Sequence, residues 1–94
     1  MKKRSLSTLN RKELRSYIFE IQDTVKSYLN NGGNVDSFID ETNLIDDFES
    51  VLPDEEYPIF VITVLNDIKS DLVIDKLLDS MLATIQSKSL VFNS

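Results

Sequence analysis

The residues of this chain that could do chemistry are carboxylates, and they crowd into one part of it. Residues 27–68 contain ten Asp and Glu and no Lys or Arg, whereas residues 1–26 carry seven basic side chains against three acidic ones. Two neighbouring carboxylates form an acid–base pair when burial raises the pKa of one of them. Several carboxylates chelate calcium when they alternate in a glycine-containing loop. Carboxylates on a surface pair instead with the Lys and Arg side chains of a binding partner.

The spacing of the acids disfavours the first two kinds of chemistry. On a helical wheel, the acids between residues 34 and 52 fall opposite the apolar side chains, so we expect them to face solvent and to keep ordinary pKa values. Residues 40–49 have neither the alternation nor the glycine of a calcium-binding loop. We therefore predict no catalytic carboxylate and no metal site.

The residue types that are missing exclude much of enzymology. The chain has no Cys and no His, which removes thiolate nucleophiles, disulfides, the usual general base and the commonest zinc ligand. No glycine-rich phosphate-binding motif is present, so nucleotide binding has no support. We predict a protein that is not an enzyme and has no cofactor.

The same composition bears on location. The basic N-terminus is followed by polar residues rather than by the apolar stretch of a secretory signal. The longest apolar run, residues 58–65, is too short to span a bilayer. Together with the absence of cysteine, these features predict a cytoplasmic protein with no membrane contact.

The chain is expected to form one domain, residues 1–94, built mostly from helices. Asn10 and Glu13 have the spacing of a capping box, and an apolar stripe through Leu14, Ile18 and Ile21 follows them. Residues 30–33, Asn-Asn-Gly-Gly, should end this first helix with left-handed residues. Residues 1–8 are predicted to be a flexible basic segment, which either solubilises the protein or contacts its own acidic region. Residues 89–94 are predicted to be a short C-terminal tail.

Residues 34–52 contain two apolar faces that one straight helix could not bury together. We expect a break near Thr42 and Asn43, which divides this part into two short acidic helices, 34–41 and 43–52, with Asn43 capping the second. Asp54 should cap a further helix, because Pro53 stops the preceding one and Pro58 is tolerated only near a helix N-terminus.

Tyr57–Leu65 is the ambiguous stretch, because it is β-branched and apolar on all sides. It fits a buried strand or a central helix, and either way we expect burial on every face. The last helix should begin at Ser70 or Asp71. The favoured fold is all-α, a single small bundle of four to five helices. The alternative is an α+β fold with Tyr57–Leu65 as a buried strand.

Two families were weighed against these features. Residues 43–50, Asn-Leu-Ile-Asp-Asp-Phe-Glu-Ser, resemble in part the segment before the phosphopantetheine serine of acyl carrier proteins, which are small acidic helical bundles. That family's Gly-x-Asp-Ser-Leu is absent, since Glu49-Ser50-Val51 stands in place of Asp-Ser-Leu and no glycine precedes it. We therefore assign no carrier function to Ser50. Small helical immunity proteins, which neutralise bacterial toxins through acidic surfaces, are similar in size, charge and helical pattern but share no motif with this chain.

These observations lead to one functional hypothesis and one alternative. The hypothesis is a non-enzymatic inhibitor of the immunity protein, antitoxin or nucleic-acid mimic type, which presents an acidic helical surface to a basic partner such as a nuclease, a toxin or a nucleic-acid-binding protein. The residues expected to contact the partner are Asp36, Asp40, Glu41, Asp46, Asp47, Glu49, Asp54, Glu55 and Glu56. The alternative is a scaffold or regulatory protein that acts as a homodimer through Tyr57–Leu65 and residues 90–92, with the acids only solubilising it. Direct nucleic-acid binding is disfavoured by the net charge of −6.

Overall fold

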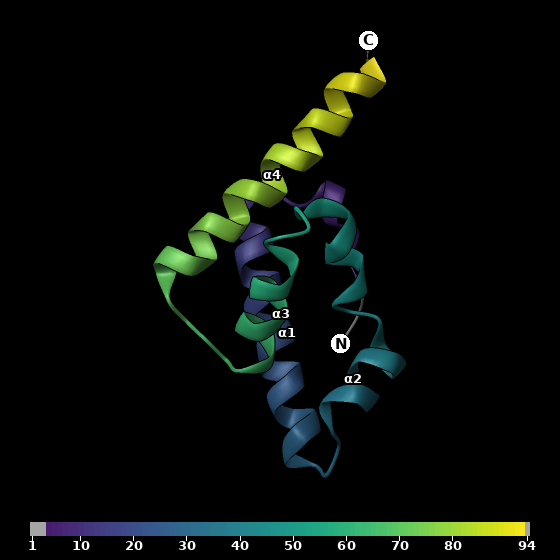
Figure 1. The fold of residues 1–94 in the computed structure, drawn as a ribbon, viewed down its shortest axis with the longest axis vertical. Helices are drawn as coiled ribbons and strands as arrows, with labels where there is room; N and C mark the ends of the chain where they lie inside the picture. Colours follow the sequence, from purple (N-terminus) through teal and green to yellow (C-terminus); the bar gives the residue numbers. More distant parts are fainter. Residues whose placement is uncertain (1–3, 94) are drawn as a thin grey trace.

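The all-α prediction is confirmed by the fold, a bundle built around one long central helix (Figure 1). The computed structural model describes the backbone of residues 4–93 and the side chains of residues 4–87. Its helices are η1 (Leu6–Thr8), α1 (Arg11–Asn30), α2 (Val35–Thr42), η2 (Asp46–Val51), α3 (Tyr57–Leu65) and α4 (Asp71–Asn93), where η denotes a 3-10 helix. Within residues 4–93 there is no strand.

The strand alternative for Tyr57–Leu65 is wrong, because these residues form α3. A strand at this position would need a partner for its backbone hydrogen bonds. The only other strand-like tract of the sequence, residues 90–92, has a helical backbone within α4. With no partner strand in the described backbone, helix is the conformation that satisfies the backbone groups of this apolar segment.

Helix α1 begins and ends as its sequence predicts. The Asn10 side chain accepts a hydrogen bond from the Glu13 backbone (2.9 Å), and the Glu13 carboxylate accepts one from the Asn10 backbone (3.1 Å), which completes the capping box. At the other end, Gly32 has φ of +92°, and Gly33 donates its N–H to the Tyr28 carbonyl at 3.0 Å. This is a Schellman ending, in which glycine takes the left-handed position without steric cost.

The break in the acidic region is at Asn43, but Asn43 ends the first helix instead of capping the second. It ends α2 in the left-handed conformation with φ of 55°, and its N–H bonds the Ile39 carbonyl at 3.4 Å. The prediction that it caps the next helix is therefore wrong. An asparagine tolerates the left-handed region unusually well, so the same residue type that suits an N-cap also suits a C-terminal stop. The following piece, η2, has no side-chain cap.

The start of α3 differs from the prediction in the same way. Asp54 does not cap it, because α3 begins at Tyr57 and the preceding Glu56 provides no side-chain cap. Instead the Glu56 and Tyr57 N–H groups both bond the Pro53 carbonyl, at 2.9 and 3.0 Å. Pro58 lies in the first turn of the helix, where its missing N–H has no consequence.

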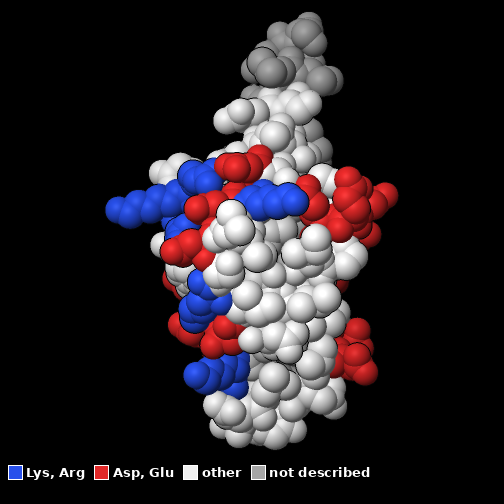
Figure 2. All heavy atoms as spheres, turned by 60° about the vertical axis from the view of Figure 1, so that its left-hand side comes forward, with Lys and Arg blue, Asp and Glu red and all other residues white. Residues whose placement is uncertain are grey.

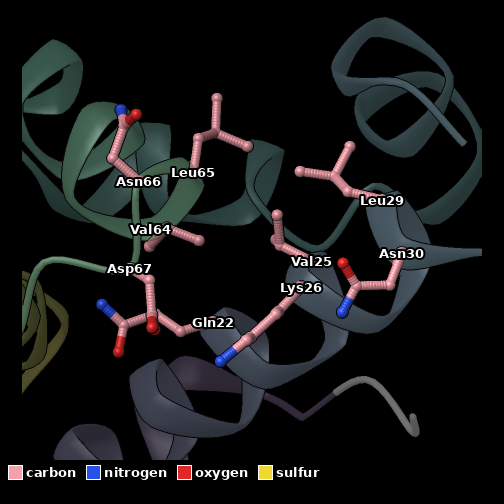
Figure 3. Close-up of a pocket in the computed structure, with 9 residues that line it drawn as sticks. All are labelled: Gln22, Val25, Lys26, Leu29, Asn30, Val64, Leu65, Asn66 and Asp67. Carbon is pink, nitrogen blue, oxygen red and sulfur yellow. The ribbon is translucent and has the colours of Figure 1, made fainter.

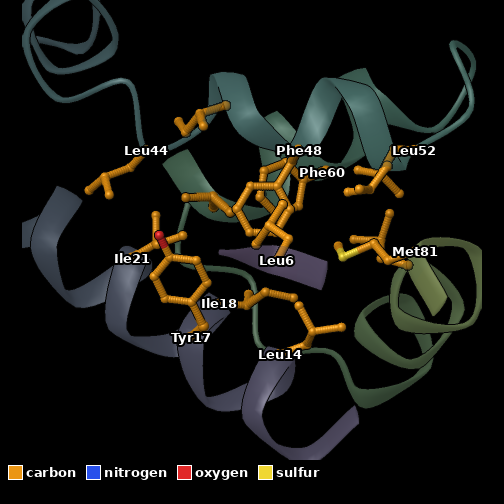
Figure 4. Close-up of a cluster of buried hydrophobic side chains, with 14 of the residues drawn as sticks. Leu6, Leu14, Tyr17, Ile18, Ile21, Leu44, Phe48, Leu52, Phe60 and Met81 are labelled. Atoms are coloured by element: carbon orange, nitrogen blue, oxygen red, sulfur yellow. The ribbon is translucent and has the colours of Figure 1, made fainter. Parts of the chain in front are cut away.

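The core is centred on aromatic rings from three separate helices (Figure 4). The Phe48 ring of η2 stacks on the Phe60 ring of α3 with 4.2 Å between centroids, and the Tyr17 ring of α1 lies 5.9 Å from Phe48. All three side chains are essentially inaccessible to solvent. Buried aromatic side chains remove large apolar areas from water, so this stack positions η2 against α1 and α3.

Helix α4 covers one side of the bundle and then continues past it (Figure 1). Its buried side chains are Ile74, Leu77, Leu78 and Met81, and none of the described side chains after Met81 is buried. The helical backbone continues to Asn93, through most of the predicted tail 89–94. The side chains of residues 90–92, which the dimer hypothesis invoked, lie outside the described residues. In the predicted flexible segment 1–8, Leu6 is 7% exposed and residues 6–8 form η1.

Candidate functional site

The nine predicted contact residues lie on α2, on η2 and on the turn that leads into α3. We call these nine carboxylates the acidic surface. Seven of them are exposed, Asp47 and Glu56 are half-buried, and none is buried. The apolar side chains of the same elements explain this orientation. Phe38 of α2 and Phe48 of η2 are fully buried, so the carboxylates on the opposite sides of these helices face outward.

The described arginines are paired with other acids, outside the acidic surface. Arg11 of α1 pairs with Asp75 and Asp79 of α4, and Arg15 pairs with Asp71 and with Asp75, the latter at 2.7 Å. We call this set the α1–α4 ladder. It joins residues some sixty positions apart in the sequence. It also pairs both arginines of α1 with acids of α4.

The described part of the basic N-terminus also pairs with an acid outside the acidic surface. The Arg4 guanidinium pairs with Glu20 at 3.2 Å and lies 5.6 Å from the centre of the Tyr17 ring, and its backbone N–H donates to the Tyr17 hydroxyl. Arg4 therefore binds to α1 rather than to the acidic surface, and the two roles expected for residues 1–8 as a whole stay predictions. Lys2 and Lys3 lie outside the described residues.

Most of the acidic surface consequently has no counter-ion among the described residues. Six of its members make no ion pair there: Asp36, Asp40, Asp46, Glu49, Asp54 and Glu55. Two others are held by hydroxyl groups, since Glu41 accepts a hydrogen bond from Tyr28 (2.8 Å) and Glu56 accepts one from Ser80 (2.6 Å). Charged side chains in this state attract cationic groups from outside the chain.

The charge separation is visible on the molecular surface (Figure 2). On the left of that view, blue basic and red acidic side chains alternate, and one blue side chain in the upper middle borders the red cluster at the upper right edge. Below it lies a broad area without charged side chains, with a second red cluster at the lower right edge. The surface thus has a charge-paired region, an uncharged region and a mainly acidic edge.

Carboxylates of the acidic surface contribute to the raised pKa values of two tyrosines, Tyr28 and Tyr57. The hydrogen bond to Glu41 raises the pKa of Tyr28 above its ordinary value of 10.0. The pKa of Tyr57 is raised first by burial and then by the negative charges of Asp46 and Glu49. The second effect is consistent with the packing of η2 against α3, in which the Phe48 ring stacks on the Phe60 ring.

The exposed apolar side chains are an unexpected feature. Ile59 and Ile62 of α3 are 45% and 55% exposed, and Leu72 at the start of α4 is 82% exposed. The prediction that Tyr57–Leu65 is buried on every face is therefore wrong. Phe60, Thr63 and Val64 face the core. On the opposite side of α3, no described helix covers Ile59 and Ile62.

A pocket of about 210 Å³ lies where the C-terminal ends of α1 and α3 meet (Figure 3). Its apolar lining is Val25 and Leu29 from α1 and Val64 and Leu65 from α3, and the rim carries Lys26, Asn30, Asn66 and Asp67. Figure 3 shows Val25 and Val64 on opposite sides of this opening.

Gln22 forms the inner end of the pocket and was missed by the sequence analysis. It is 1% exposed, its amide donates to the Thr63 and Ile68 carbonyls at 3.2 and 2.8 Å, and its carbonyl accepts from Lys69 at 2.9 Å. The available signal was its position, because Gln22 interrupts the apolar stripe between Ile18 and Val25. Its hydrogen bonds connect α1 to the end of α3, so its role is structural.

The described residues hold no group of three or more carboxylates, His or Cys that could bind a metal ion. No described helix has both the length and the hydrophobicity needed to cross a membrane. The chain matches no protein-family model, no curated protein and no solved structure. The features on which a functional argument can rest are therefore the exposed acidic surface and the exposed apolar side chains.

Proposed function

We propose that this protein is a non-enzymatic inhibitor that binds a basic protein through the acidic surface, as immunity proteins, antitoxins and nucleic-acid mimics do. The mechanism is competition. Carboxylates spaced along α2 and η2 occupy the Lys and Arg side chains that a nuclease, a toxin or a nucleic-acid-binding protein uses to contact phosphates. Complementary charge also accelerates the encounter and disfavours acidic partners.

One observation carries this proposal: the chain pairs its arginines with the acids of α4 and of α1, while most of the acidic surface has no counter-ion among the residues that the structure describes. If the acids served solubility alone, acids scattered over the whole surface would suffice. An acid placed where its charge opposes folding supports a binding role more strongly, because it does not serve stability. Asp40 lies in the last turn of α2, which has no basic residue, and a negative charge there opposes the helix dipole.

The test is a binding assay on candidate basic partners at low and at high salt, with the wild-type protein and a triple variant. The triple variant carries Asp46→Asn, Asp47→Asn and Glu49→Gln, which changes the net charge from −6 to −3. We expect at least tenfold weaker binding by the variant, because about 1.4 kcal/mol corresponds to tenfold and each charge-assisted hydrogen bond contributes about that much. Binding by the wild-type protein should also weaken in high salt.

A charge-matched control separates local contacts from overall attraction. Ser16→Lys, Asp23→Asn and Ser27→Lys together also bring the net charge to −3, but they lie on exposed positions of α1. This control should keep most of the affinity. If a partner stays bound in high salt and tolerates the triple variant, binding does not depend on the acidic surface and the proposal is wrong.

The alternative function is homo-oligomerisation, and the exposed Ile59 and Ile62 favour it. In that case α3 forms a subunit interface and the acids only solubilise the protein. Analytical ultracentrifugation over a wide concentration range tests it directly. A monomer at high concentration excludes this function, whereas a dimer that Ile62→Gln dissociates supports it.

A further inference from the structure

The turn between α1 and α2, at the lower end of α1 in Figure 1, contains two neighbouring residues that can react with each other. Asn31 is the one asparagine of the chain that precedes a glycine, Gly32. The main-chain nitrogen of a glycine can attack the side-chain amide of the asparagine before it, because glycine has no Cβ to hinder the approach. Both residues are exposed, and a Cβ built on Gly32 would meet no atom within 4 Å. Water therefore reaches both reacting groups.

We infer that Asn31 is a deamidation site of this protein and that the ending of α1 controls its rate. In the first step the Gly32 nitrogen gives its proton to solvent and forms a bond to Cγ of Asn31. The Cγ–Nδ2 bond breaks, and ammonia leaves with a proton from water. Water then opens the resulting succinimide ring at one of its two carbonyl carbons. Opening at Cγ leaves aspartate, whereas opening at the main-chain carbon leaves isoaspartate, in which the main chain runs through Cβ.

The folded backbone holds the two reacting atoms apart. Ring closure requires a rotation about the Cα–C bond of Asn31 that brings the Gly32 nitrogen next to the side chain. The observed ψ of Asn31 is 18°, and in this conformation the Gly32 N–H donates to the Leu29 carbonyl, with 3.2 Å between nitrogen and oxygen. Gly33 donates in the same way to the Tyr28 carbonyl at 3.0 Å. The rotation would break these hydrogen bonds.

Deamidation therefore requires the last turn of α1 to open. Native proteins open locally without unfolding as a whole, most easily at chain segments with few buried contacts. The rate in the folded protein is the rate in the open turn multiplied by the fraction of time that the turn is open. In denaturant the turn is always open. The ratio of the two rates thus measures how firmly α1 ends, and each factor of ten corresponds to about 1.4 kcal/mol.

Either product weakens the junction of α1 and α2. The new carboxylate adds one negative charge to a net charge of −6. It lies at the C-terminal end of α1, whose last turn has no basic residue, and there it opposes the helix dipole. Isoaspartate also adds a methylene group to the main chain, which displaces Gly33 from its place against the Tyr28 ring. Because Tyr28 packs edge-on against Phe38 of α2, the change reaches the first helix of the acidic surface.

The experiment follows the full-length protein by peptide mapping and mass spectrometry during incubation in buffer and in urea. The pH is mildly alkaline, because the attacking nitrogen must lose its proton. Conversion of the amide to a carboxylate changes the mass of the peptide, and chromatography separates the aspartate form from the isoaspartate form. In urea we expect Asn31 to convert faster than any other asparagine. In buffer we expect the same conversion to be at least about tenfold slower.

Two variants and one control locate the cause. Gly32→Ala places a Cβ beside the attacking nitrogen, so conversion of Asn31 should nearly stop in urea as well as in buffer. Gly33→Ala keeps the Asn-Gly pair, but its Cβ would lie 2.2 Å from the Tyr28 ring. It should accelerate conversion in buffer by about tenfold and leave the rate in urea unchanged. Lys76→Gln, at an exposed position of α4, should change neither rate. Circular dichroism establishes that each variant is folded.

Each result either supports the inference or overturns it. Faster conversion of another asparagine in urea, or none at Asn31, would mean that Asn31 is not the site. Equal rates in buffer and in urea would mean that the ending of α1 does not control the reaction. An unchanged rate in buffer for a folded Gly33→Ala would overturn that control as well. The inference does not depend on the proposed function, because none of these measurements involves a partner protein.

Discussion

The side chain of Tyr28 holds the first acidic helix, α2, against α1, and Gly33 leaves the space for its ring. A Cβ atom at this position would lie 2.2 Å from the Tyr28 ring, which packs edge-on against Phe38 of α2 and donates its hydroxyl proton to Glu41. Tyr28 therefore carries much of the contact between α1 and α2. The glycine matters because it leaves room for that ring.

We predict that Gly33→Ala lowers the free energy of unfolding by about 1–3 kcal/mol, because Tyr28 must move away from α2. Chemical denaturation measures this loss. Gly32→Ala is the control, since its Cβ meets nothing but its φ of +92° costs an alanine about 1–2 kcal/mol. Only Gly33→Ala should shift the NMR signals of Phe38. Unchanged Phe38 signals in Gly33→Ala would contradict the proposed role of Tyr28.

The raised pKa values of Tyr28 and Tyr57 predict that the free energy of unfolding decreases at alkaline pH. The pKa of Tyr28 is raised above 10.0 in the folded protein, first by its hydrogen bond to Glu41, and the pKa of Tyr57 is raised first by burial and then by the charges of Asp46 and Glu49. The folded state thus binds these phenolic protons more tightly than the unfolded state. The resulting stabilisation is complete below pH 10.0 and is lost as the pH rises through the raised pKa values.

Tyr28→Phe tests this at one site. The variant should lose the hydrogen bond to Glu41 and, with it, part of the decrease in stability above pH 10.0. The measurement is the unfolding midpoint at a series of pH values, together with NMR titration of the tyrosine rings. A Tyr28 ring that titrates at or below its ordinary pKa in the folded protein would be the contrary result.

At the scale of elements, the α1–α4 ladder attaches the last helix to the first. Asp75 is its shared member, because it contacts both Arg11 and Arg15. The side chains involved are between 32% and 78% exposed, so water and salt screen them and the network contributes little per pair. Most of the attachment of α4 must come from its buried side chains.

Asp75→Asn should accordingly reduce the free energy of unfolding by no more than about 1 kcal/mol at low salt. In high salt the difference from the wild-type protein should nearly vanish. Lys76→Gln, a neighbouring exposed position of α4 with no ion pair among the described residues, should have little effect at either salt concentration. A loss of several kcal/mol for Asp75→Asn would mean that the ladder, rather than the core, holds α4.

The elements that could be predicted from the sequence are those fixed by local interactions. The capping box at Asn10 and Glu13, the glycine ending and the start of α4 all depend on residues a few positions apart. The roles of Asn43 and Gln22 could not be predicted, because each depends on what the chain does elsewhere. Asn43 suits both the end of one helix and the start of another, and the hydrogen-bond partners of Gln22 are some forty residues away.

The candidate site could likewise be predicted only in part. The outward orientation of the acids followed from the helical period, because buried Phe38 and Phe48 fix which side of α2 and η2 faces inward. The exposure of Ile59 and Ile62 did not follow from it. A helix that is apolar on all sides gives no sign of which side its neighbours leave open, so the exposure of Ile59 and Ile62 depends on the packing of the whole chain.

For the whole molecule, the decisive feature is where charge is compensated and where it is not. The chain measures 48 × 26 × 23 Å, so the α1–α4 ladder and the acidic surface lie only a few screening lengths apart at physiological salt. Arg11 and Arg15 of α1 nevertheless pair with the acids of α4. Uncompensated carboxylates repel one another, and an arrangement that lowers stability in this way is typical of a surface used for binding.

Asp40 allows that argument to be tested on stability and binding together. It lies at the C-terminal end of α2, where a negative charge opposes the helix dipole, and it has no ion pair among the described residues. Asp40→Lys should therefore raise the free energy of unfolding by about 0.3–1 kcal/mol at low salt, and the gain should shrink as salt is added. The same variant should bind a basic partner more weakly.

Asp36→Lys is the matched control, because it makes the same change of charge in the first turn of the same exposed helix. There a positive charge opposes the dipole, so this variant should gain less stability than Asp40→Lys, or lose some, while weakening partner binding to a similar degree. Denaturant unfolding and calorimetric binding on the same preparations give both quantities. If Asp40→Lys lowers stability instead, the carboxylate contributes to the fold, and its cost to the isolated chain no longer argues for a binding role.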